Sequence, residues 1–316
     1  MSSAPQSTPK RITIPMLRDM KREGKRFAMV TAYDFVQART VDEAGVEVIL
    51  VGDSLSNVLL GHETTLPVTL DEMIYHCKAV VRARKRCLVV GDMPFLSYQI
   101  TVEEAIRNAG RFLKEGGADC VKLEGGEDVR DTVYAIVRAG IPVMGHVGLT
   151  PQTVSKLGGY RVQGRDVLSA RAIADAALAL QDAGVFSIVL ECVPAEVARE
   201  VTERLEIPTI GIGAGPSCDA QVLVYHDMLG LTPESKMRFV KRYAELGKEA
   251  TDALRRFAEE VRAGSFPGVE HSFTMREGEE AKLPSVMPRN TRDAVGDGLV
   301  SPPGEVPPAP TRVELP

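Results

Sequence analysis

The segment Val48-Ile-Leu-Val-Gly-Asp53 is an apolar run that ends in a carboxylate. Runs of this kind are typical of strands in a parallel sheet, which are buried on both faces. The C-terminal ends of such strands carry the active site in α/β barrels, so the pattern predicts that carboxylates, a lysine and an imidazole gather at one mouth. The pattern recurs in Leu88-Val-Val-Gly-Asp92, Val121-Lys122-Leu-Glu124, Val143-Met-Gly-His146 and Ile188-Val-Leu-Glu191.

Helix signals separate the apolar runs. Thr69-Leu-Asp-Glu72 and Thr101-Val-Glu-Glu104 match the capping box that starts a helix. Eight strands that alternate with helices predict an α/β fold of the (β/α)8 TIM barrel type, whose usual size of about 250 residues matches residues 25–265. An open doubly wound sheet is the alternative. The expected strands cover residues 28–33, 47–53, 87–93, 120–125, 142–147, 186–192, 208–213 and 222–228.

The chain divides into three parts by composition. Residues 1–11 are polar and are expected to be a flexible N-terminus, and residues 12–273 are expected to form the barrel catalytic domain, with an extra N-terminal helix at 13–23 and C-terminal helices within 233–263. Residues 274–316 are Pro-rich and carry few large apolar side chains, so a disordered tail is expected there. A Pro-rich ligand for a partner domain is the alternative for this tail.

The overall charge favours small-molecule substrates. A formal charge of -5 and a pI near 5.7 argue against nucleic acid or an anionic membrane as partner. No apolar stretch approaches the roughly 18 residues of a membrane span, and the N-terminus lacks the apolar centre of a signal peptide. Five scattered cysteines suit reduced thiols better than disulfides or a zinc site. We therefore expect a cytoplasmic protein.

Three acidic residues predict a metal site. Asp53, Asp92 and Glu124 end neighbouring strands, so their carboxylates are expected to converge. Hard oxygen donors without cysteine or paired histidine suit Mg2+ or Mn2+. The alternative for each acid on its own is a surface loop position or a helix cap.

Lys122 and His146 are candidate substrate-binding groups. Lys122 lies two residues before Glu124, so strand alternation places both on the inner face, where a lysine could bind the carboxylate of an anionic substrate. A Schiff-base role and a structural ion pair with Glu124 are the alternatives. His146 is a candidate hydrogen-bond donor to substrate, with a core histidine as the alternative.

Glu191 is the candidate general base. It ends the sixth apolar run, across the barrel from the metal carboxylates, and Pro194 suits the first turn of the next helix. A plain helix-start acid is the alternative. The glycines of Gly211-Ile-Gly-Ala-Gly215 are expected to let the backbone approach substrate closely, with a phosphate loop as the alternative.

Ten segments of this chain resemble the ketopantoate hydroxymethyltransferase family. They extend over about residues 12–273. The matching segments are Thr31-Ala-Tyr-Asp34, Val51-Gly-Asp-Ser-Leu55, Gly61-His-Glu-Thr-Thr-Leu-Pro-Val-Thr69, Gly91-Asp-Met-Pro-Phe95, Val121-Lys-Leu-Glu-Gly-Gly126, Gly145-His-Val-Gly-Leu-Thr-Pro-Gln152, Gly158-Gly-Tyr-Arg-Val-Gln-Gly164, Leu190-Glu-Cys-Val-Pro194, Ile210-Gly-Ile-Gly-Ala-Gly215 and Glu270-His-Ser-Phe273.

The resemblance implies an activity and a set of site residues. The activity is transfer of a hydroxymethyl group from 5,10-methylenetetrahydrofolate to 3-methyl-2-oxobutanoate, which gives 2-dehydropantoate. By resemblance, Asp53, Asp92 and Glu124 hold Mg2+, Ser54 and Lys122 help to hold the keto acid, and Glu191 is the base. The resemblance also implies a homodecamer.

Two other functions stay open at this point. Mg2+ barrels of the isocitrate lyase and phosphoenolpyruvate mutase type also hold the enolate of a 2-oxo acid, and an absence of folate dependence would favour a lyase or mutase of that type. A scaffold that displays the Pro-rich tail would require a broken site, but every carboxylate of the expected site is present.

Overall fold

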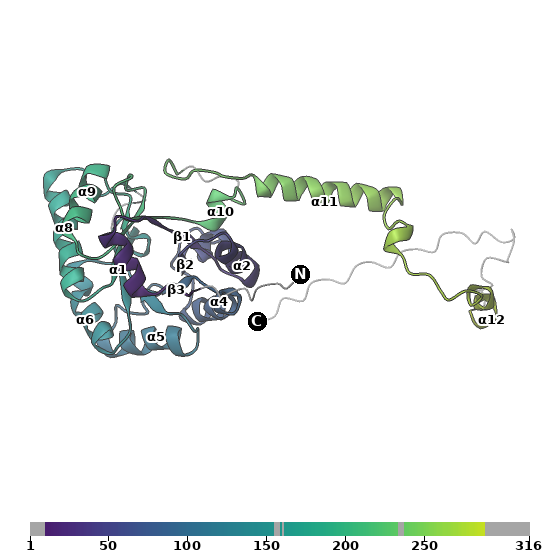
Figure 1. Ribbon diagram of the computed structural model, residues 1–316, viewed down its shortest axis with the longest axis horizontal. Coiled ribbons are helices and arrows are strands. Elements are labelled where there is room, and N and C mark those ends of the chain that lie inside the picture. Colours follow the sequence, from purple (N-terminus) through teal and green to yellow (C-terminus); the bar gives the residue numbers. More distant parts are fainter. Residues whose placement is uncertain (1–9, 155–158, 160, 233–236, 288–316) are drawn as a thin grey trace, which may run out of the picture. The chain divides into compact units, whose positions relative to one another are not determined.

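Eight parallel strands form a closed barrel in chain order (Figure 1). The computed structural model describes residues 10–154, 159, 161–232 and 237–287. Strand β1 pairs with both β2 and β8, and this pairing closes the sheet. The prediction of a TIM barrel is therefore confirmed, and the doubly wound alternative is wrong. The strands are β1 (Phe27–Thr31), β2 (Val48–Val51), β3 (Leu88–Asp92), β4 (Cys120–Lys122), β5 (Val143–Gly148), β6 (Ser187–Glu191), β7 (Thr209–Ile212) and β8 (Ala220–Leu223).

Helices alternate with the strands and surround the barrel (Figure 1). At the start of α4 the Thr69 hydroxyl accepts from the Glu72 N–H and the Glu72 carboxylate accepts from the Thr69 N–H, so the predicted capping box is confirmed. The helices between strands are α2 (Phe35–Glu43), α3 (Leu55–Val58), α4 (Leu70–Ala83), α5 (Val102–Lys114), α6 (Arg130–Arg138), α8 (Val167–Asp182) and α9 (Ala195–Arg204), and α10 (Tyr225–Met228) follows β8.

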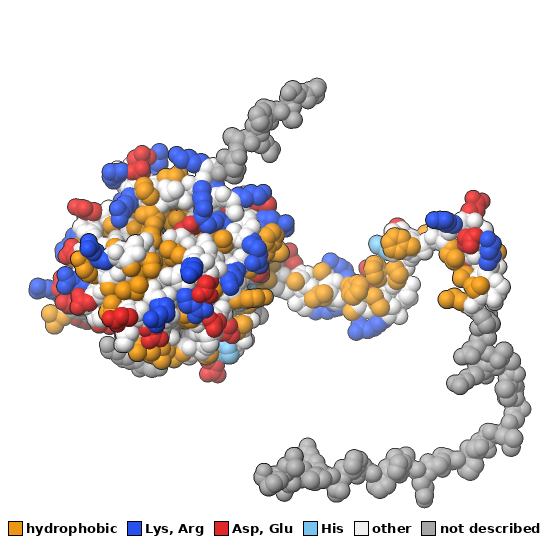
Figure 2. Space-filling view, turned by 90° about the horizontal axis from the view of Figure 1, so that it is seen from below, with side chains coloured by type: hydrophobic (Ala, Val, Ile, Leu, Met, Phe, Trp, Pro, Cys, Tyr) orange, Lys and Arg blue, Asp and Glu red, His pale blue; other side chains and the backbone are white. Residues whose placement is uncertain are grey.

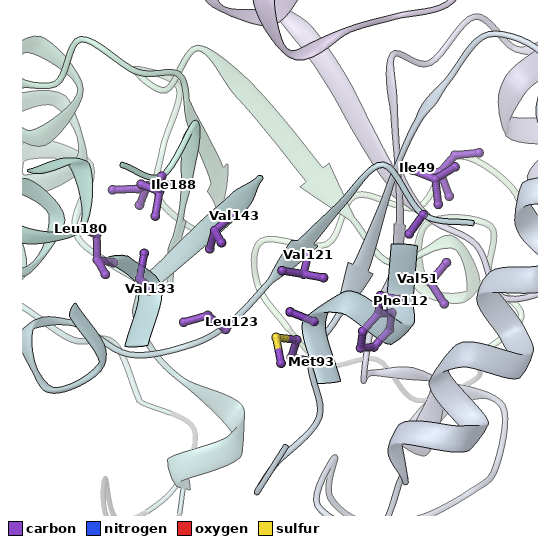
Figure 3. Packing of buried hydrophobic residues seen from close by; sticks show 14 of the residues in the cluster. Ile49, Val51, Met93, Phe112, Val121, Leu123, Val133, Val143, Leu180 and Ile188 are labelled. Carbon is purple, nitrogen blue, oxygen red and sulfur yellow. The ribbon is translucent and has the colours of Figure 1, made fainter. Parts of the chain in front are cut away.

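Strand alternation divides the core into two clusters. One side of each strand packs against the helices, and Figure 3 shows part of this outer cluster, including Phe112 of α5 and Leu180 of α8. A Cβ at Gly91 would lie 2.3 Å from the Phe112 ring, so glycine is required where this ring packs on β3. The other side of the strands fills the barrel interior with residues such as Leu50, Val90 and Met144.

Helix α1 (Ile14–Arg22) packs against the interior cluster of the barrel. Its Leu17 is fully buried and belongs to the same cluster as the inward-facing strand residues. Lys21 forms an ion pair with Asp219, directly before β8, at 2.9 Å. The helix therefore lies at the N-terminal ends of the strands, opposite the expected active site, and the prediction of an extra helix at 13–23 is confirmed.

Two sequence predictions were wrong in detail. The eighth strand ends at Leu223 instead of residue 228, because the Tyr225 N–H donates to the Thr31 hydroxyl and Tyr225 begins a short helix. One or two C-terminal helices were expected within 233–263, and helix α11 covers Leu246–Ala263, so the expected helical positions at 237–243 lie outside it. The N–H groups of Tyr243 and Leu246 donate to the carbonyls of Met228 and Leu229, and these bonds replace helical ones; residues 233–236 lie outside the described part.

The chain divides into two compact units, residues 1–253 and 254–316. In the second unit, the rings of Phe257 and Phe266 lie 5.5 Å apart. Three short helical segments follow among the described residues, η3 (Val269–His271), η4 (Glu280–Lys282) and α12 (Leu283–Val286). The expected disorder of the 274–316 tail stays a prediction, because residues 288–316 lie outside the described part, as do residues 1–9 of the expected flexible N-terminus.

Charged side chains of both signs are intermixed over the visible face of the barrel (Figure 2). In the part of the chain that the structure describes, no helix has the length and apolar character needed to cross a membrane.

Candidate active site

A cavity of about 510 Å³ lies where the barrel strands end. Its wall contains all seven side chains that the sequence singled out. Because these residues come from four strands, β3 to β6, and from the loops after β2 and β4, only the closed barrel brings them together. The seven are Asp53, Ser54, Asp92, Lys122, Glu124, His146 and Glu191.

The cavity has a polar side and an apolar side. Strands β3 to β6 and the residues after β2 and β4 supply Asp53, Asp92, Glu124 and Glu191 together with the lysine and the histidine. The other side is mostly apolar and includes residues from β2, β7 and β8 and from a later loop. Its apolar residues include Leu50, Ile212, Val222, Val224, Met237, Phe239 and Val240.

Lys122 is a buried ammonium among carboxylates. Its Nζ lies 2.8 Å from Asp92 Oδ1 and 3.7 Å from Glu124 Oε1. Burial by itself lowers the pKa of Lys122, but the charges of Asp92 and Glu124 outweigh it and raise the pKa above its ordinary value. The lysine is therefore charged. A Schiff base requires a neutral amine, so this environment favours an anion-binding lysine.

Negative charge is in excess around this lysine. Among the described residues, six acidic side chains and one lysine line the cavity. Burial raises the pKa of Asp92 to about 7, against the opposing effect of Lys122 and with a further contribution from Asp53. Burial also raises the pKa of Glu124 well above its usual range. Such a set of acids is stabilised by protons or by a cation.

The donor set suits Mg2+ in its chemistry. Oδ1 of Asp92 is buried and receives no aligned hydrogen bond, and the surrounding groups offer hard carboxylate oxygens. Within the described ranges, no three His, Cys, Asp or Glu side chains already stand together as a metal site. Mg2+ commonly binds through one or two carboxylates and keeps several waters, so a complete protein cage is not required.

His146 links the lysine to Glu191. Its Nδ1 lies 3.2 Å from Lys122 Nζ, and its Nε2 lies 3.3 Å from Glu191 Oε2. Burial and the Lys122 charge lower the pKa of His146, so the ring is neutral. An ammonium can only donate, so Nδ1 is the acceptor and Nε2 carries the proton that faces the Glu191 carboxylate.

Glu191 has a partly exposed side chain, while its backbone is fixed by strand pairing. It is the last residue of β6, and its side chain is 16% exposed. It pairs in register with Ile212 of β7, and both side chains line the cavity. A carboxylate at the edge of an apolar wall is therefore placed to meet an apolar part of a bound substrate.

Ser54 is held by a tyrosine that the sequence analysis did not single out. The Tyr33 hydroxyl lies 2.8 Å from the Ser54 Oγ, and Tyr33 is fully buried. Burial raises the pKa of Tyr33, so its hydroxyl is neutral. Tyr33 belongs to a segment that carried the family resemblance, and this was the only signal available for it.

Gln152 is a second residue that sequence reasoning missed. It is 3% exposed, and its side-chain amide donates to Asp53 Oδ2 at 3.0 Å. Its backbone N–H donates to Glu124 Oε2, also at 3.0 Å. The Tyr98 hydroxyl donates to the Gln152 carbonyl oxygen at 2.7 Å. Gln152 thus donates hydrogen bonds to two of the expected metal ligands, Asp53 and Glu124.

A family model described as ketopantoate hydroxymethyltransferase matches residues 11–269. The chain belongs to the ketopantoate hydroxymethyltransferase family. The resemblance found in the sequence is confirmed, and so is the prediction that the chain is an enzyme of the transferase class.

Curated members of this hydroxymethyltransferase family match over most of their length. The chain is 57% identical over 265 residues to 3-methyl-2-oxobutanoate hydroxymethyltransferase of Carboxydothermus hydrogenoformans, covering 84% of this chain and 96% of the relative. It is 59% identical over 263 residues to the protein of the same name from Moorella thermoacetica, covering 83% and 98%.

Solved structures of other enzymes share the fold of this family member. Phosphonopyruvate hydrolase in complex with oxalate and Mg2+ aligns with a TM-score of 0.56 at 12% identity, covering 87% of this chain and 99% of that one. A 2,3-dimethylmalate lyase of the PEP mutase/isocitrate lyase superfamily aligns with a TM-score of 0.53 at 16% identity, covering 88% and 99%. These likenesses show the fold alone, whereas the close sequence relatives are all named hydroxymethyltransferases.

Proposed function

We propose that this chain transfers a hydroxymethyl group from 5,10-methylenetetrahydrofolate to 3-methyl-2-oxobutanoate, which gives 2-dehydropantoate and tetrahydrofolate in pantothenate and coenzyme A biosynthesis. One water molecule is consumed in the balanced reaction. The observation that carries the proposal is a single cavity with Lys122 and Glu191 on its polar side, in a chain whose close relatives bear this enzyme's name.

Asp53, Asp92 and Glu124 are the proposed ligands of Mg2+. The excess of acidic groups in the cavity wall supports this assignment, and so does the buried Asp92 Oδ1, which faces Lys122 but receives no aligned hydrogen bond. When bound, the cation would withdraw electron density from the keto acid and so stabilise its enolate. The remaining chemistry is assigned to side chains of this chain.

Lys122 and Ser54 are proposed to bind the keto acid. A charged, buried lysine attracts the substrate carboxylate strongly, because little water screens the interaction. The Ser54 hydroxyl is oriented by Tyr33 and offers a further hydrogen bond. Asp53, Asp92 and His146 complete the proposed substrate-binding set, with the His146 imidazole as a neutral donor.

Glu191 is proposed to remove the proton from C3 of the keto acid. The Nε2–H of His146 lies 3.3 Å from its carboxylate and faces it. The neighbouring Ile212 offers an apolar surface to the branched alkyl group that carries this proton. Loss of the proton leaves an electron pair on C3, and this carbon then attacks the methylene carbon of the folate.

Proton NMR in D2O tests the proposal in two stages. With Mg2+ and 3-methyl-2-oxobutanoate alone, the C3 proton signal is expected to disappear at an enzyme-dependent rate. Addition of 5,10-methylenetetrahydrofolate is then expected to give 2-dehydropantoate resonances. Exchange without product would point to another electrophile and hence to the lyase or mutase alternative, whereas no exchange by the folded protein would overturn the proposal.

Location and assembly are part of the same proposal. A cytoplasmic homodecamer is expected from the family resemblance. Sedimentation velocity of the full chain checks the assembly, because a decamer has ten times the mass of the 34.2 kDa chain. A monomer or dimer at micromolar concentration would contradict it.

A further inference from the structure

Gln152 lies in the loop after β5 and touches two of the proposed metal ligands. It belongs to a short 3-10 turn, Pro151–Thr153, and is buried. We infer that Gln152, oriented by Tyr98, is a positioning residue that sets the carboxylates of Asp53 and Glu124 for cation binding. The inference rests on the proposed Mg2+ site.

The direction of the Gln152 amide follows from its neighbours. Its Nε2 lies 2.9 Å from the Met93 carbonyl oxygen, which can only accept a hydrogen bond. The same nitrogen lies 3.0 Å from Asp53 Oδ2. The two N–H bonds of the amide therefore point to Met93 and Asp53. The opposite amide orientation would bring its oxygen against two acceptors.

Tyr98 fixes the other end of the amide. The Tyr98 hydroxyl accepts from the Glu124 N–H at 3.1 Å, and its own proton has two acceptors within reach, Gln152 Oε1 at 2.7 Å and the Glu124 carbonyl oxygen at 3.1 Å, of which the Gln152 oxygen is the nearer. Tyr98 is 2% exposed, and burial raises its pKa well above the ordinary value, so this proton stays on the oxygen. A neutral tyrosine thus stabilises the orientation of the amide in which Gln152 Nε2 donates to Asp53.

Gln152 binds each carboxylate through one oxygen only, and Oε1 of Glu124 faces the Lys122 ammonium at 3.7 Å. The Gln152 side chain donates to Asp53 Oδ2, and its backbone N–H donates to Glu124 Oε2. Oδ1 of Asp53 and Oε1 of Glu124 are outside these two bonds, and both residues line the cavity. Because a donated hydrogen bond favours an oxygen that carries negative charge, Gln152 both aims the two acids and keeps them suited to a cation.

Two variants separate positioning from packing. Gln152→Met keeps the length and volume of the side chain and removes its donors, and Tyr98→Phe removes only the hydroxyl that orients the amide. Gln163→Leu is the matched control, since among the described residues the Gln163 side-chain amide donates to the Arg161 carbonyl and does not line the site cavity. Circular dichroism and thermal melting of each full-length variant establish that it is folded.

The readout is Mg2+ binding to the substrate-free protein by isothermal titration calorimetry. Loss of a hydrogen-bond partner behind a metal ligand typically costs about 10- to 100-fold in affinity, so this weakening is expected for Gln152→Met, a smaller one for Tyr98→Phe and none for Gln163→Leu. Raising the Mg2+ concentration is expected to restore kcat in both variants, because the cation then re-orders the acids. A purely structural role would give no such rescue.

The outcomes also separate this inference from the proposed function. If the wild-type chain does not bind Mg2+, the proposed metal site itself fails. If the wild-type chain binds Mg2+ and a folded Gln152→Met or Tyr98→Phe variant binds it within twofold of wild type, only the positioning role is overturned. Should Gln152→Met fail to fold, the Tyr98→Phe result decides.

Discussion

Nζ of Lys122 lies 3.2 Å from Nδ1 of His146, an approach that a protonated imidazole would oppose. The lysine is charged and buried, so it fixes the histidine in the neutral form with its proton on Nε2. That proton faces Glu191. The Lys122 ammonium on β4 therefore sets the protonation form of the ring on β5 that faces the candidate base on β6, and this relationship connects the substrate-binding side of the site with the acid–base side.

Glu191→Gln is expected to abolish exchange of the C3 proton while keto acid binding is retained. The amide has the shape of the carboxylate but cannot take up a proton, and removal of a general base typically lowers the rate by about 10²- to 10⁴-fold. The exchange experiment in D2O and calorimetric titration with the keto acid measure the two effects. Glu196→Gln, an exposed acid at the start of α9, is the control, and normal exchange by Glu191→Gln would remove Glu191 from the role.

Lys122→Met is expected to destabilise the metal-free protein. The substitution leaves Asp92 and Glu124 buried without their partner, and loss of one member of a buried ion pair typically costs about 3–5 kcal/mol in free energy of unfolding. Chemical denaturation in the presence of a chelator measures the loss. Mg2+ is expected to restore part of it, whereas Lys114→Met, an exposed change at the end of α5, leaves stability unaltered.

Protonation of His226 is expected to lower the stability of the chain as the pH drops below about 6.5, against the opposite contribution of the buried acids Asp92 and Glu124, whose pKa values are raised. Burial lowers the pKa of His226, and its Nδ1 has no hydrogen-bond partner. The unfolded state therefore binds a proton at a pH at which the folded state does not. Each such group changes the free energy of unfolding by at most about 1.4 kcal/mol per pH unit. His226→Gln is expected to reduce the slope, and His62→Gln, at an exposed position, to leave it unchanged.

Denaturation curves at pH 7.5 and pH 5.5 measure this slope. Because His146 is also buried with a lowered pKa, some dependence on pH is expected to remain in the His226→Gln variant. A slope in that variant equal to the wild-type slope would contradict the assignment.

Gly213→Ala is expected to displace a side chain of the cavity wall, whereas Gly24→Ala is expected to leave the cavity unchanged. Both glycines have a left-handed backbone, with φ values of +63° and +65°, which costs alanine about 1–2 kcal/mol. A Cβ at Gly213 would also lie 2.8 Å from the ring of Phe239, which lines the cavity, while a Cβ at Gly24 would meet nothing within 4 Å. A larger loss of Tm and a raised KM are therefore expected for Gly213→Ala only, and equal effects in the two variants would contradict this account.

The sequence by itself determined the barrel and the list of strand-end residues. Each buried strand is a local apolar run, and each chemical group stands at a fixed place on its own run, as Asp92 and Glu191 do. The short-range rules of strand burial and helix capping were therefore sufficient to place them at one mouth. The same rules overestimated the helix before Leu246, because distant backbone partners decide that stretch.

Only the tertiary structure decided how the site is supported. Gln152 reaches Asp53 across 99 residues of sequence, and Tyr33 reaches Ser54 across 21. Such hydrogen bonds between distant residues leave no periodic pattern in the chain. They form because closure of the barrel buries polar groups together, and a buried polar group without a partner is costly, so the fold selects partners that the linear sequence does not reveal.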